Sequence, residues 1–256
     1  MSFASFRVTR RSFAALAAAP LLALLLHACA ATPHEPVEKK DVKVTGAYVT
    51  LISDEGRQRI ERSPYRVDYV SLMATFIMQE RQTLCSVATG VTILNALPVK
   101  RPVDPKYAPY PFFTQANYFN DRVDAIITRD TTLKIGQTLQ QAAAVMAAHG
   151  AATKAYHAAD SSVDEFRRIA KANMSSRNDF IAVNYRRNHV GQPPGAHFSP
   201  LAAYDEPSDS FLILDVARYK FPPVWVTAAD LFDAMNTLDT DSGKTRGFIV
   251  VSAGGG

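Results

Sequence analysis

Only two cysteines, Cys29 and Cys85, occur in the 256 residues, and this scarcity constrains the fold more than any other feature of the sequence. Cys29 ends an apolar leader, so a chain that loses or modifies it has no disulfide to stabilise it. The remaining residues, about 225 of them, must fold on a hydrophobic core, and that length is sufficient for one domain. Cys85 is then an unpaired thiol, which either packs as a small buried side chain or reacts.

Residues 1–30 have the pattern of an export signal. Arg10 and Arg11 belong to a basic start, and the apolar run after them is too short to span a bilayer comfortably. The arginine pair resembles a twin-arginine signal, which predicts export to the periplasm in the folded state. Residues 26–29 are similar to a lipobox with Cys29 as the lipidated residue, but the same segment fits a small-residue cleavage site. An outer-membrane lipoprotein and a soluble periplasmic protein therefore both stay open, with an uncleaved membrane anchor as a third interpretation.

Loss of the leader also changes the charge balance. The full chain carries 28 Lys+Arg and 24 Asp+Glu. Three arginines leave with the leader and no acid does, so 25 basic residues face 24 acidic ones, a net charge of +1. Such a balance gives no support for a nucleic-acid partner. Residues 31–45 are charged and contain prolines, which predicts a tether, and the folded domain is expected over residues 46–256.

Helical patterns come first in the domain and strand patterns follow, which predicts an α+β fold. Val87, Val91 and Leu94 recur at helical spacing, so a helix is expected from near Cys85 to Pro98. Further helices are predicted over 138–149, 162–173 and 229–238, and strands over 180–185, 197–204, 210–216 and 247–252. The turn-rich residues 205–209 predict a hairpin between two of the strands. Residues 48–78 give no clear pattern.

The layout places Cys85 at a helix N-terminus, where backbone N–H groups and the helix dipole favour a thiolate. His197 and Asp215 follow on predicted strands. A thiol needs a base to become a nucleophile, and the base needs an acceptor that holds its tautomer. The chain order Cys, His, Asp is typical of papain-like enzymes. The residues therefore predict a cysteine-nucleophile acyl-transfer enzyme, and a buried structural cysteine is the alternative.

Several longer motifs accompany these three residues in a characteristic order. They are residues 94–97, 113–119, 183–185, 197–204 (His197-Phe198-Ser199-Pro200-Leu201-Ala202-Ala203-Tyr204), 215–226, 235–237 and 244–248. Through nearly all of residues 48–252 the chain resembles the phytochelatin synthase family, in particular the short bacterial form without the C-terminal metal-sensing domain. The resemblance implies a papain-like fold, in which a helix carrying the nucleophile packs on an antiparallel sheet carrying His and Asp.

The resemblance also implies a reaction. Cys85 would attack the cysteinyl carbonyl of glutathione, release glycine and form a γ-glutamylcysteinyl thioester. Water as acceptor would give hydrolysis to γ-Glu-Cys, and another glutathione or phytochelatin as acceptor would give phytochelatin synthesis. Because the Cys-rich C-terminal part is missing, hydrolysis is expected to outweigh extension. His197 would act as base and then acid, and Asp215 would orient it.

Four more residues take roles through the resemblance. Gln79 is the expected side-chain donor to the oxyanion, beside a backbone N–H at Cys85. Asp239 is expected to bind the substrate α-amine and Arg246 its α-carboxylate, with Asn184 as a nearby hydrogen-bonding group. The alternative for Asp239 and Arg246 is ordinary charge on a surface turn.

Three departures from the family pattern leave acceptor access open, because each adds bulk near the cleft: Ser86, Ala196 and the pair Pro193-Pro194. No cofactor is expected for acylation and no metal site is predicted, although Cd or Zn bound to substrate thiols is expected to stimulate transfer. The expected partners are glutathione and related thiol peptides, and a lipid anchor and a homodimer stay open. Competing functions are a papain-like peptidase or amidase on other peptides and a non-enzymatic thiol or metal-binding protein, for which one thiol is a poor site.

Overall fold

The computed structural model describes residues 44–254. The predicted leader, the lipidation candidate Cys29 and all but the last two residues of the predicted tether lie outside the described residues. Within residues 44–254, no helix is both long and apolar enough to cross a membrane.

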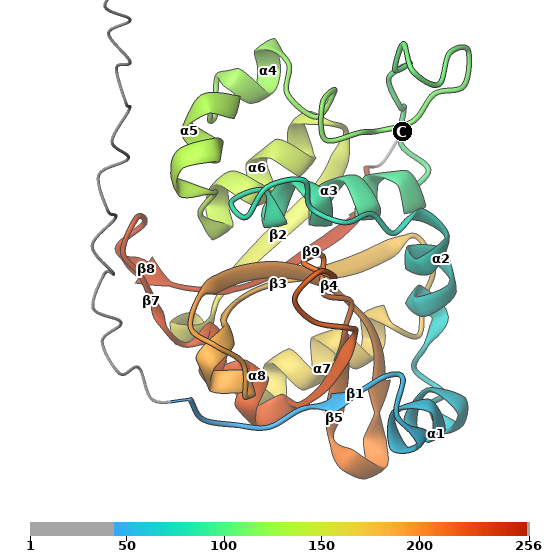
Figure 1. Ribbon diagram of the computed structural model, residues 1–256, viewed down its shortest axis with the longest axis vertical. Coiled ribbons are helices and arrows are strands. Elements are labelled where there is room, and N and C mark those ends of the chain that lie inside the picture. Colours follow the sequence, from blue (N-terminus) through green and yellow to red (C-terminus); the bar gives the residue numbers. More distant parts are fainter. Residues whose placement is uncertain (1–43, 255–256) are drawn as a thin grey trace, which may run out of the picture. The chain divides into compact units, whose positions relative to one another are not determined.

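A seven-stranded sheet organises the described part of the chain (Figure 1). All neighbouring strands are antiparallel. The order across the sheet is β1 (Val49–Thr50), β6 (Val224–Thr227), β5 (Ser210–Ile213), β4 (Ala196–Asp205), β3 (Asp179–Arg186), β9 (Gly247–Ala253) and β2 (Ala151–His157). A separate two-stranded ribbon, β7 (Leu238–Asp239) with β8 (Lys244–Thr245), projects beside it. The mixed α+β class with an antiparallel sheet agrees with the sequence-based prediction.

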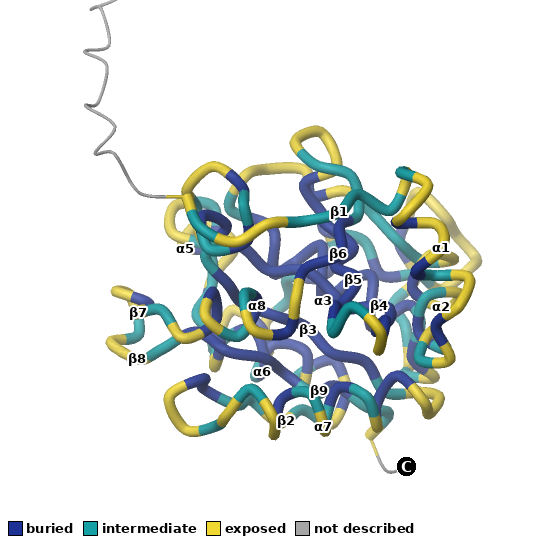
Figure 2. The backbone as a smooth tube through the Cα atoms, turned by 90° about the horizontal axis from the view of Figure 1, so that it is seen from below, coloured by how far each residue is buried: buried dark blue, intermediate teal, exposed yellow. Residues whose placement is uncertain are grey.

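Helices cover both faces of this sheet. Phe180 and Ala182 of β3 pack in one buried cluster with α3 (Cys85–Ala96) and α6 (Leu139–Ala148). Ile181 and Val183 pack in a second cluster with α7 (Val163–Asn173) and α8 (Ala228–Met235). Because both faces are buried, β3 is a continuous apolar run rather than an alternating one. Figure 2 shows the buried strands at the centre and the exposed loops around them.

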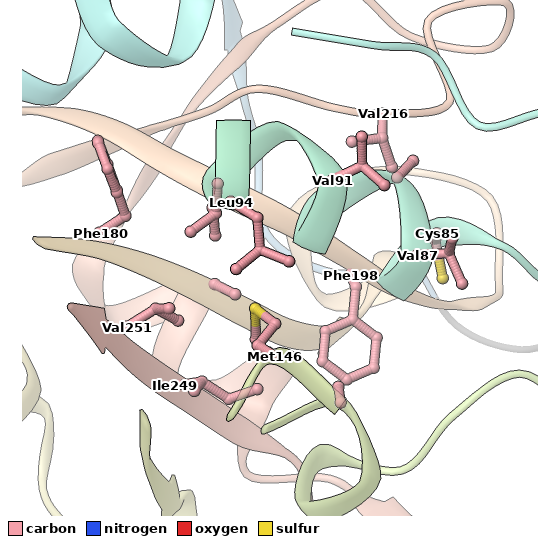
Figure 3. Close-up of a cluster of buried hydrophobic side chains, with 14 of the residues drawn as sticks. Cys85, Val87, Val91, Leu94, Met146, Phe180, Phe198, Val216, Ile249 and Val251 are labelled. Atoms are coloured by element: carbon pink, nitrogen blue, oxygen red, sulfur yellow. The ribbon is translucent and has the colours of Figure 1, made fainter. Parts of the chain in front are cut away.

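Helix α3 runs through the centre of the first cluster, and eleven of its twelve residues are buried. Figure 3 shows Val87, Val91 and Leu94 on this helix, with Met146 of α6 and Phe180 of β3 in the same cluster. A helix that is buried on all sides is held by packing rather than by exposed ion pairs. The nucleophile candidate at its first residue therefore sits on a rigid support.

The predicted helices and strands are present with small shifts. The structure has α3, α6 and α7 where they are expected, and Thr138 caps α6 in a full capping box with Gln141. Ser162 caps α7 by accepting from the Glu165 N–H, whereas the Glu165 carboxylate accepts from Ser161 instead of completing a second box. The predicted hairpin is the antiparallel pair β4–β5.

Two predicted boundaries are wrong. The predicted strand 210–216 ends at Ile213, so Asp215 lies in the following loop, where its carboxylate accepts from the Ala217 N–H at 2.8 Å and turns the chain. The predicted helix 229–238 is α8, which ends at Met235. Leu238 belongs to the ribbon strand β7.

Several elements carried no clear sequence signal. Residues 48–78, left unassigned above, hold β1, α1 (Asp54–Arg62) and α2 (Val67–Thr75). The short helices α4 (Asp121–Asp124) and α5 (Arg129–Ile135), the strands β2 and β6, and the 3₁₀ turns η1 (Ala158–Asp160), η2 (Arg187–Val190) and η3 (Glu206–Ser208) complete the described chain.

The first described residues are bonded to η2. The Thr45 N–H donates to the Asn188 carbonyl at 2.6 Å, and the Gly191 N–H donates to the Thr45 carbonyl at 2.8 Å. Gly46 has φ +72°, and a Cβ there would lie 2.2 Å from the His189 carbonyl oxygen. Only glycine fits this close approach, so the segment is seated on η2.

Candidate active site

Cys85 is the first residue of α3, and Leu84 at the N-cap makes no side-chain capping bond. The first N–H groups of a helix have no partner within it, so those at the start of α3 are available to an anion. Cys85 is 9% exposed, and its thiol is close enough to the ring of His197 in β4 for each group to shift the pKa of the other. Helix and sheet therefore bring together two residues that are 112 positions apart in the sequence.

His197 is held from its other side by Asp215. The ring Nε2–H donates to Asp215 Oδ1 at 2.8 Å, which leaves Nδ1 as the ring nitrogen for Cys85. His197 is 3% exposed and Asp215 is fully buried. The chain Cys85–His197–Asp215 thus has the connectivity of a nucleophile, a base and an orienting carboxylate.

Arg187 in η2 completes the hydrogen bonding of Asp215. Its guanidinium is bidentate, with Nη1 to Asp215 Oδ2 at 2.6 Å and Nη2 to Asp215 Oδ1 at 2.9 Å. Nη1 also donates to Gln192, and the guanidinium lies 5.0 Å from the centre of the Phe221 ring. Arg187 is 5% exposed, so this is a buried ion pair with the fork geometry that favours carboxylate.

These contacts shift the pKa values toward a charged pair. Burial is the strongest influence on the Cys85 thiol and opposes ionisation, but His197 and the backbone of Phe198 and Ser86 outweigh it and lower the Cys85 pKa. Burial likewise opposes protonation of His197, yet Asp215 and Cys85 raise its pKa. The Asp215 pKa is lowered because His197 and Arg187 outweigh its burial. The site favours a thiolate beside an imidazolium.

A pocket of about 260 Å³ opens onto Cys85 and His197. Its walls come from the ends of β3 and β4, the β7–β8 ribbon and the segment before α6. The lining residues are Gln82, Thr83, Cys85, Ile135, Gly136, Gln137, Asn184, Arg186, Ala196, His197, Phe198, Asp239, Thr240, Asp241 and Arg246. The three residues predicted to bind substrate, Asn184, Asp239 and Arg246, therefore line the same pocket as the nucleophile.

Asp239 and Arg246 are buried rather than exposed on a turn. They are 7% and 4% exposed, and Arg246 Nη2 lies 3.5 Å from Asp239 Oδ1. Arg246 Nη1 donates to the carbonyl oxygens of Thr237 and Leu238, while Nε is buried without a hydrogen-bond partner. Burial lowers the Arg246 pKa, and the charge of Asp239 only partly offsets this. The alternative of simple surface charge is wrong for this pair.

Gln79, the predicted oxyanion donor, is buried in the segment before α3. Its backbone N–H donates to the Val216 carbonyl at 2.9 Å, just beyond Asp215. Its side-chain Nε2 donates to Tyr219 Oη at 2.8 Å and to the Gln82 carbonyl at 3.3 Å. Gln79 is not among the residues that line the pocket. One of its two N–H bonds would have to yield before it could donate to an oxyanion.

Sequence reasoning missed Arg187. Arg218, three residues after Asp215, lies over the Phe76 ring, 5.4 Å from its centre. The only sequence signal for Arg187 was its position directly after an apolar strand. Of the three departures from the family pattern, Ala196 lines the pocket, Ser86 is buried with its Oγ unpartnered, and Pro193 and Pro194 are exposed.

Chemically, the arrangement offers a nucleophilic thiolate, a proton carrier and a pocket with paired charges. Within residues 44–254, no three His, Cys, Asp or Glu side chains gather as a metal site would require. Acyl transfer through a thioester is the reaction class that such a site can support.

Comparison with known proteins gives a family. A family model described as phytochelatin synthase matches residues 39–248. The chain is similar to glutathione gamma-glutamylcysteinyltransferase 1 of Lotus japonicus, with 31% identity over 184 residues, 72% of this chain and 36% of the relative. It is 30% identical to the protein of the same name from Arabidopsis thaliana, over 72% of this chain and 37% of the relative. The Schizosaccharomyces pombe glutathione gamma-glutamylcysteinyltransferase is 29% identical over 72% of this chain and 43% of its own length. The chain spans less than half the length of these curated relatives.

Proposed function

Because the chain belongs to the phytochelatin synthase family, we propose that it is a glutathione γ-glutamylcysteinyltransferase with Cys85 as nucleophile. The observation that carries this proposal is one pocket with two parts. The first part is the Cys85–His197 pair, whose pKa shifts favour a thiolate beside an imidazolium. The second is the buried pair Asp239–Arg246, which can match the amine and carboxylate of a γ-glutamyl group.

In the first step, Cys85 Sγ attacks the cysteinyl carbonyl carbon of glutathione. The tetrahedral intermediate collapses as protonated His197 gives its proton to the glycine nitrogen, the C–N bond breaks and glycine leaves. A γ-glutamylcysteinyl thioester on Cys85 remains. The bonds from Asp215 to His197 and Arg187 support this step, because they hold the imidazole in place and stabilise its charge.

In the second step, His197 takes a proton from the acceptor as the acceptor attacks the thioester, and the Cys85 thiolate is regenerated. Water gives γ-Glu-Cys, and the α-amine of another glutathione or of a phytochelatin gives a longer peptide. We propose that hydrolysis outweighs extension. The pocket of about 260 Å³ supports this, because two thiol peptides would compete for a small space.

The oxyanion of both intermediates would lie near the start of α3. Backbone N–H groups there are the nearest donors, since the helix begins without a side-chain cap. Gln79 Nε2 joins them in this proposal after exchanging its bond to Tyr219, a residue that is 52% exposed.

The proposal also covers the fold and the role of metal ions. The arrangement of α3 against β4 supports a papain-like fold, with the thiol on a helix and the imidazole on an antiparallel sheet. Acylation needs no cofactor in this proposal, and Cd or Zn enters as a metal-thiolate form of the substrate.

Export through Arg10 and Arg11 and lipidation at Cys29 remain proposals from the sequence. Lysine at both arginines should retain the precursor in the cytoplasm, and normal export of that variant would exclude the route.

The decisive experiment is incubation of the full chain with glutathione, with and without Cd²⁺, followed by separation of products by mass. Released glycine with γ-Glu-Cys indicates hydrolysis, and (γ-Glu-Cys)₂-Gly indicates transfer. Cys85→Ser should abolish both, whereas Cys29→Ser, the matched change at the other cysteine, should leave both unchanged. Glycine release by Cys85→Ser within tenfold of the parent would exclude the cysteine mechanism. Activity on unrelated peptides but not on glutathione would favour a general peptidase or amidase.

A further inference from the structure

The pocket contains one positively charged side chain that has no hydrogen-bond or ion-pair partner in the described chain. Arg186 lines the pocket together with Arg246, but within residues 44–254 its guanidinium makes neither a hydrogen bond nor an ion pair. Its charge is close enough to disfavour protonation of Arg246. Two guanidinium groups that face one pocket repel each other, and an anion between or beside them removes that cost.

The position of Arg186 relates it to the reacting atoms. It is the last residue of β3 and lies on the same strand face as Asn184, one step of about 6.6 Å further along. Across the β3–β4 ladder it is opposite Ala196, the residue before His197. Arg246 directly precedes β9, whose Gly247 pairs with Asn184 of β3, and its guanidinium lies 3.5 Å from Asp239. Arg186 therefore lies beside the strand that carries His197, whereas Arg246 lies on the other side of β3, on the segment that leads into β9.

The charges of glutathione can be matched to Asp239 and these two arginines. At neutral pH the tripeptide has one ammonium group and two carboxylates. The proposed γ-glutamyl site uses Asp239 for the ammonium and Arg246 for the α-carboxylate. The glycine carboxylate is then the only charge of the substrate without a partner, and Arg186 is the only arginine of the pocket without one.

We propose that Arg186 binds the glycine carboxylate of the donor glutathione and makes the site selective for a free C-terminus. This inference rests on the proposed function. His197 protonates the glycine nitrogen, and the carboxylate is two bonds further along the leaving group. An arginine opposite the residue that precedes His197 is placed for that group. Departure of glycine removes the charge, so Arg186 binds donor and leaving group but not the acyl-enzyme.

A second residue of the pocket supports the binding of a peptide. Gln137 precedes α6 and lines the pocket, and both polar atoms of its amide are buried without a hydrogen-bond partner among the described residues. An amide in that state matches the N–H and C=O groups of a peptide bond better than it matches apolar side chains. The Gln137 amide and the Arg186 guanidinium are thus both available to a substrate in the same pocket.

The test compares glutathione with its glycine monoethyl ester, which lacks only the C-terminal charge. Release of glycine or glycine ethyl ester is measured as kcat/KM under hydrolytic conditions. The parent chain should prefer glutathione by about 10–100-fold, as expected for a charge-assisted hydrogen bond. Arg186→Gln should lose that preference through a higher KM for glutathione, with ester turnover unchanged. Arg168→Gln, an exposed arginine of α7, is the matched control and should behave as the parent.

The possible results separate the two proposals. If the parent chain releases nothing from either compound, the proposed function fails and this inference fails with it. If the parent releases both equally well, the function stands and Arg186 does not recognise the carboxylate. If Arg186→Gln slows both substrates in parallel, Arg186 supports the site rather than the substrate. Should Arg186→Gln fold poorly, the comparison in the parent chain still decides, and Arg186→Lys should keep part of the preference.

Discussion

The carboxylate at the centre of the catalytic side and the polar groups of the recognition side differ in how completely they are hydrogen-bonded. On the catalytic side, the carboxylate of Asp215 accepts bonds from His197, Ala217 and both terminal nitrogens of Arg187. On the recognition side, Arg246 is 3.5 Å from Asp239, and neither Arg186 nor the Gln137 amide has a hydrogen-bond partner within residues 44–254.

This contrast separates two tasks. A nucleophile and its base work best when their geometry is fixed before substrate arrives, because reorganisation during the reaction costs rate. Groups that bind a charged substrate must instead keep donors and acceptors free for it. Buried polar groups cost free energy when they lack partners, so the recognition side is stabilised by substrate and the catalytic side is not.

The largest expected effect is on the catalytic side. Asp215→Asn should lower kcat by about 10⁴-fold, because a neutral amide cannot stabilise the imidazolium of His197. Glycine release measures this effect, and alkylation of Cys85 should slow as well, because His197 then assists ionisation less. A decrease in kcat of less than tenfold would mean that Asp215 does not stabilise the imidazolium of His197.

A matched pair of arginines tests the contrast in stability. Arg187→Gln should lower the free energy of unfolding by about 3–5 kcal/mol, because Asp215 would stay buried without its bidentate partner. Arg246→Gln should cost much less, roughly 1 kcal/mol, because burial already disfavours its charge and its ion pair is longer. Urea unfolding of both variants provides the comparison, and equal losses would refute it.

Gln79 tests whether the catalytic side also stabilises the oxyanion. Gln79→Leu should lower kcat by about 10²–10³-fold if the side chain donates to the intermediate. Tyr219→Phe is the control, since it removes only the hydroxyl that Gln79 contacts, and it should leave kcat nearly unchanged. A large effect of both changes would indicate that the Gln79–Tyr219 bond positions the segment before α3.

The pH dependence follows from the opposite shifts of Cys85 and His197. The lowered Cys85 pKa keeps the thiolate at pH values below its ordinary range, and the raised His197 pKa keeps the imidazolium above pH 6.5. Activity should fall on the acid side as Cys85 gains a proton and on the alkaline side as His197 loses one. At pH 6.5, alkylation of Cys85 should be on the order of tenfold or more faster than that of an ordinary thiol. Equal rates would exclude the ion pair.

The smallest effect is expected at Gln137. Gln137→Leu should raise the free energy of unfolding by about 1 kcal/mol, because it replaces a buried, unpartnered amide with an apolar group of similar size. KM for glutathione should rise a few-fold at the same time. Thermal unfolding and steady-state kinetics on one preparation would show the gain in stability and the rise in KM together. A loss of stability in the variant would mean that the Gln137 amide has a hydrogen-bond partner in solution.

The sequence predicted the parts of the fold with strong local patterns. The apolar spacing of α3, the cap of α6 at Thr138 and the apolar run of β3 were each sufficient to predict the element that contains them. Helix α1 was missed because its sequence is mostly charged and its apolar face is narrow. Asp215 was expected on a strand because its neighbours are apolar, but they are buried in the loop where that carboxylate bonds its own backbone.

The same limit applies to the site. Cys85, His197 and Asp215 could be picked out because each lies in a recognisable motif, and the structure brings them into contact. Arg187 could not, because its partner is 28 residues away and only the pairing of β3, β4 and β5 brings them together. Arg186 and Gln137 are functional candidates only because the folded chain leaves them without partners in the pocket, which no local pattern encodes.

The seating of Thr45 and Gly46 on η2 sets a limit on how far the chain can be shortened. Those two residues brace the turn that carries Arg187, and Arg187 holds Asp215. A protease cut after Gly46 would therefore remove a brace of the catalytic side without touching a catalytic residue. A shortened form that begins at residue 44 should keep full turnover, whereas one that begins at residue 48 should lose turnover and heat resistance together.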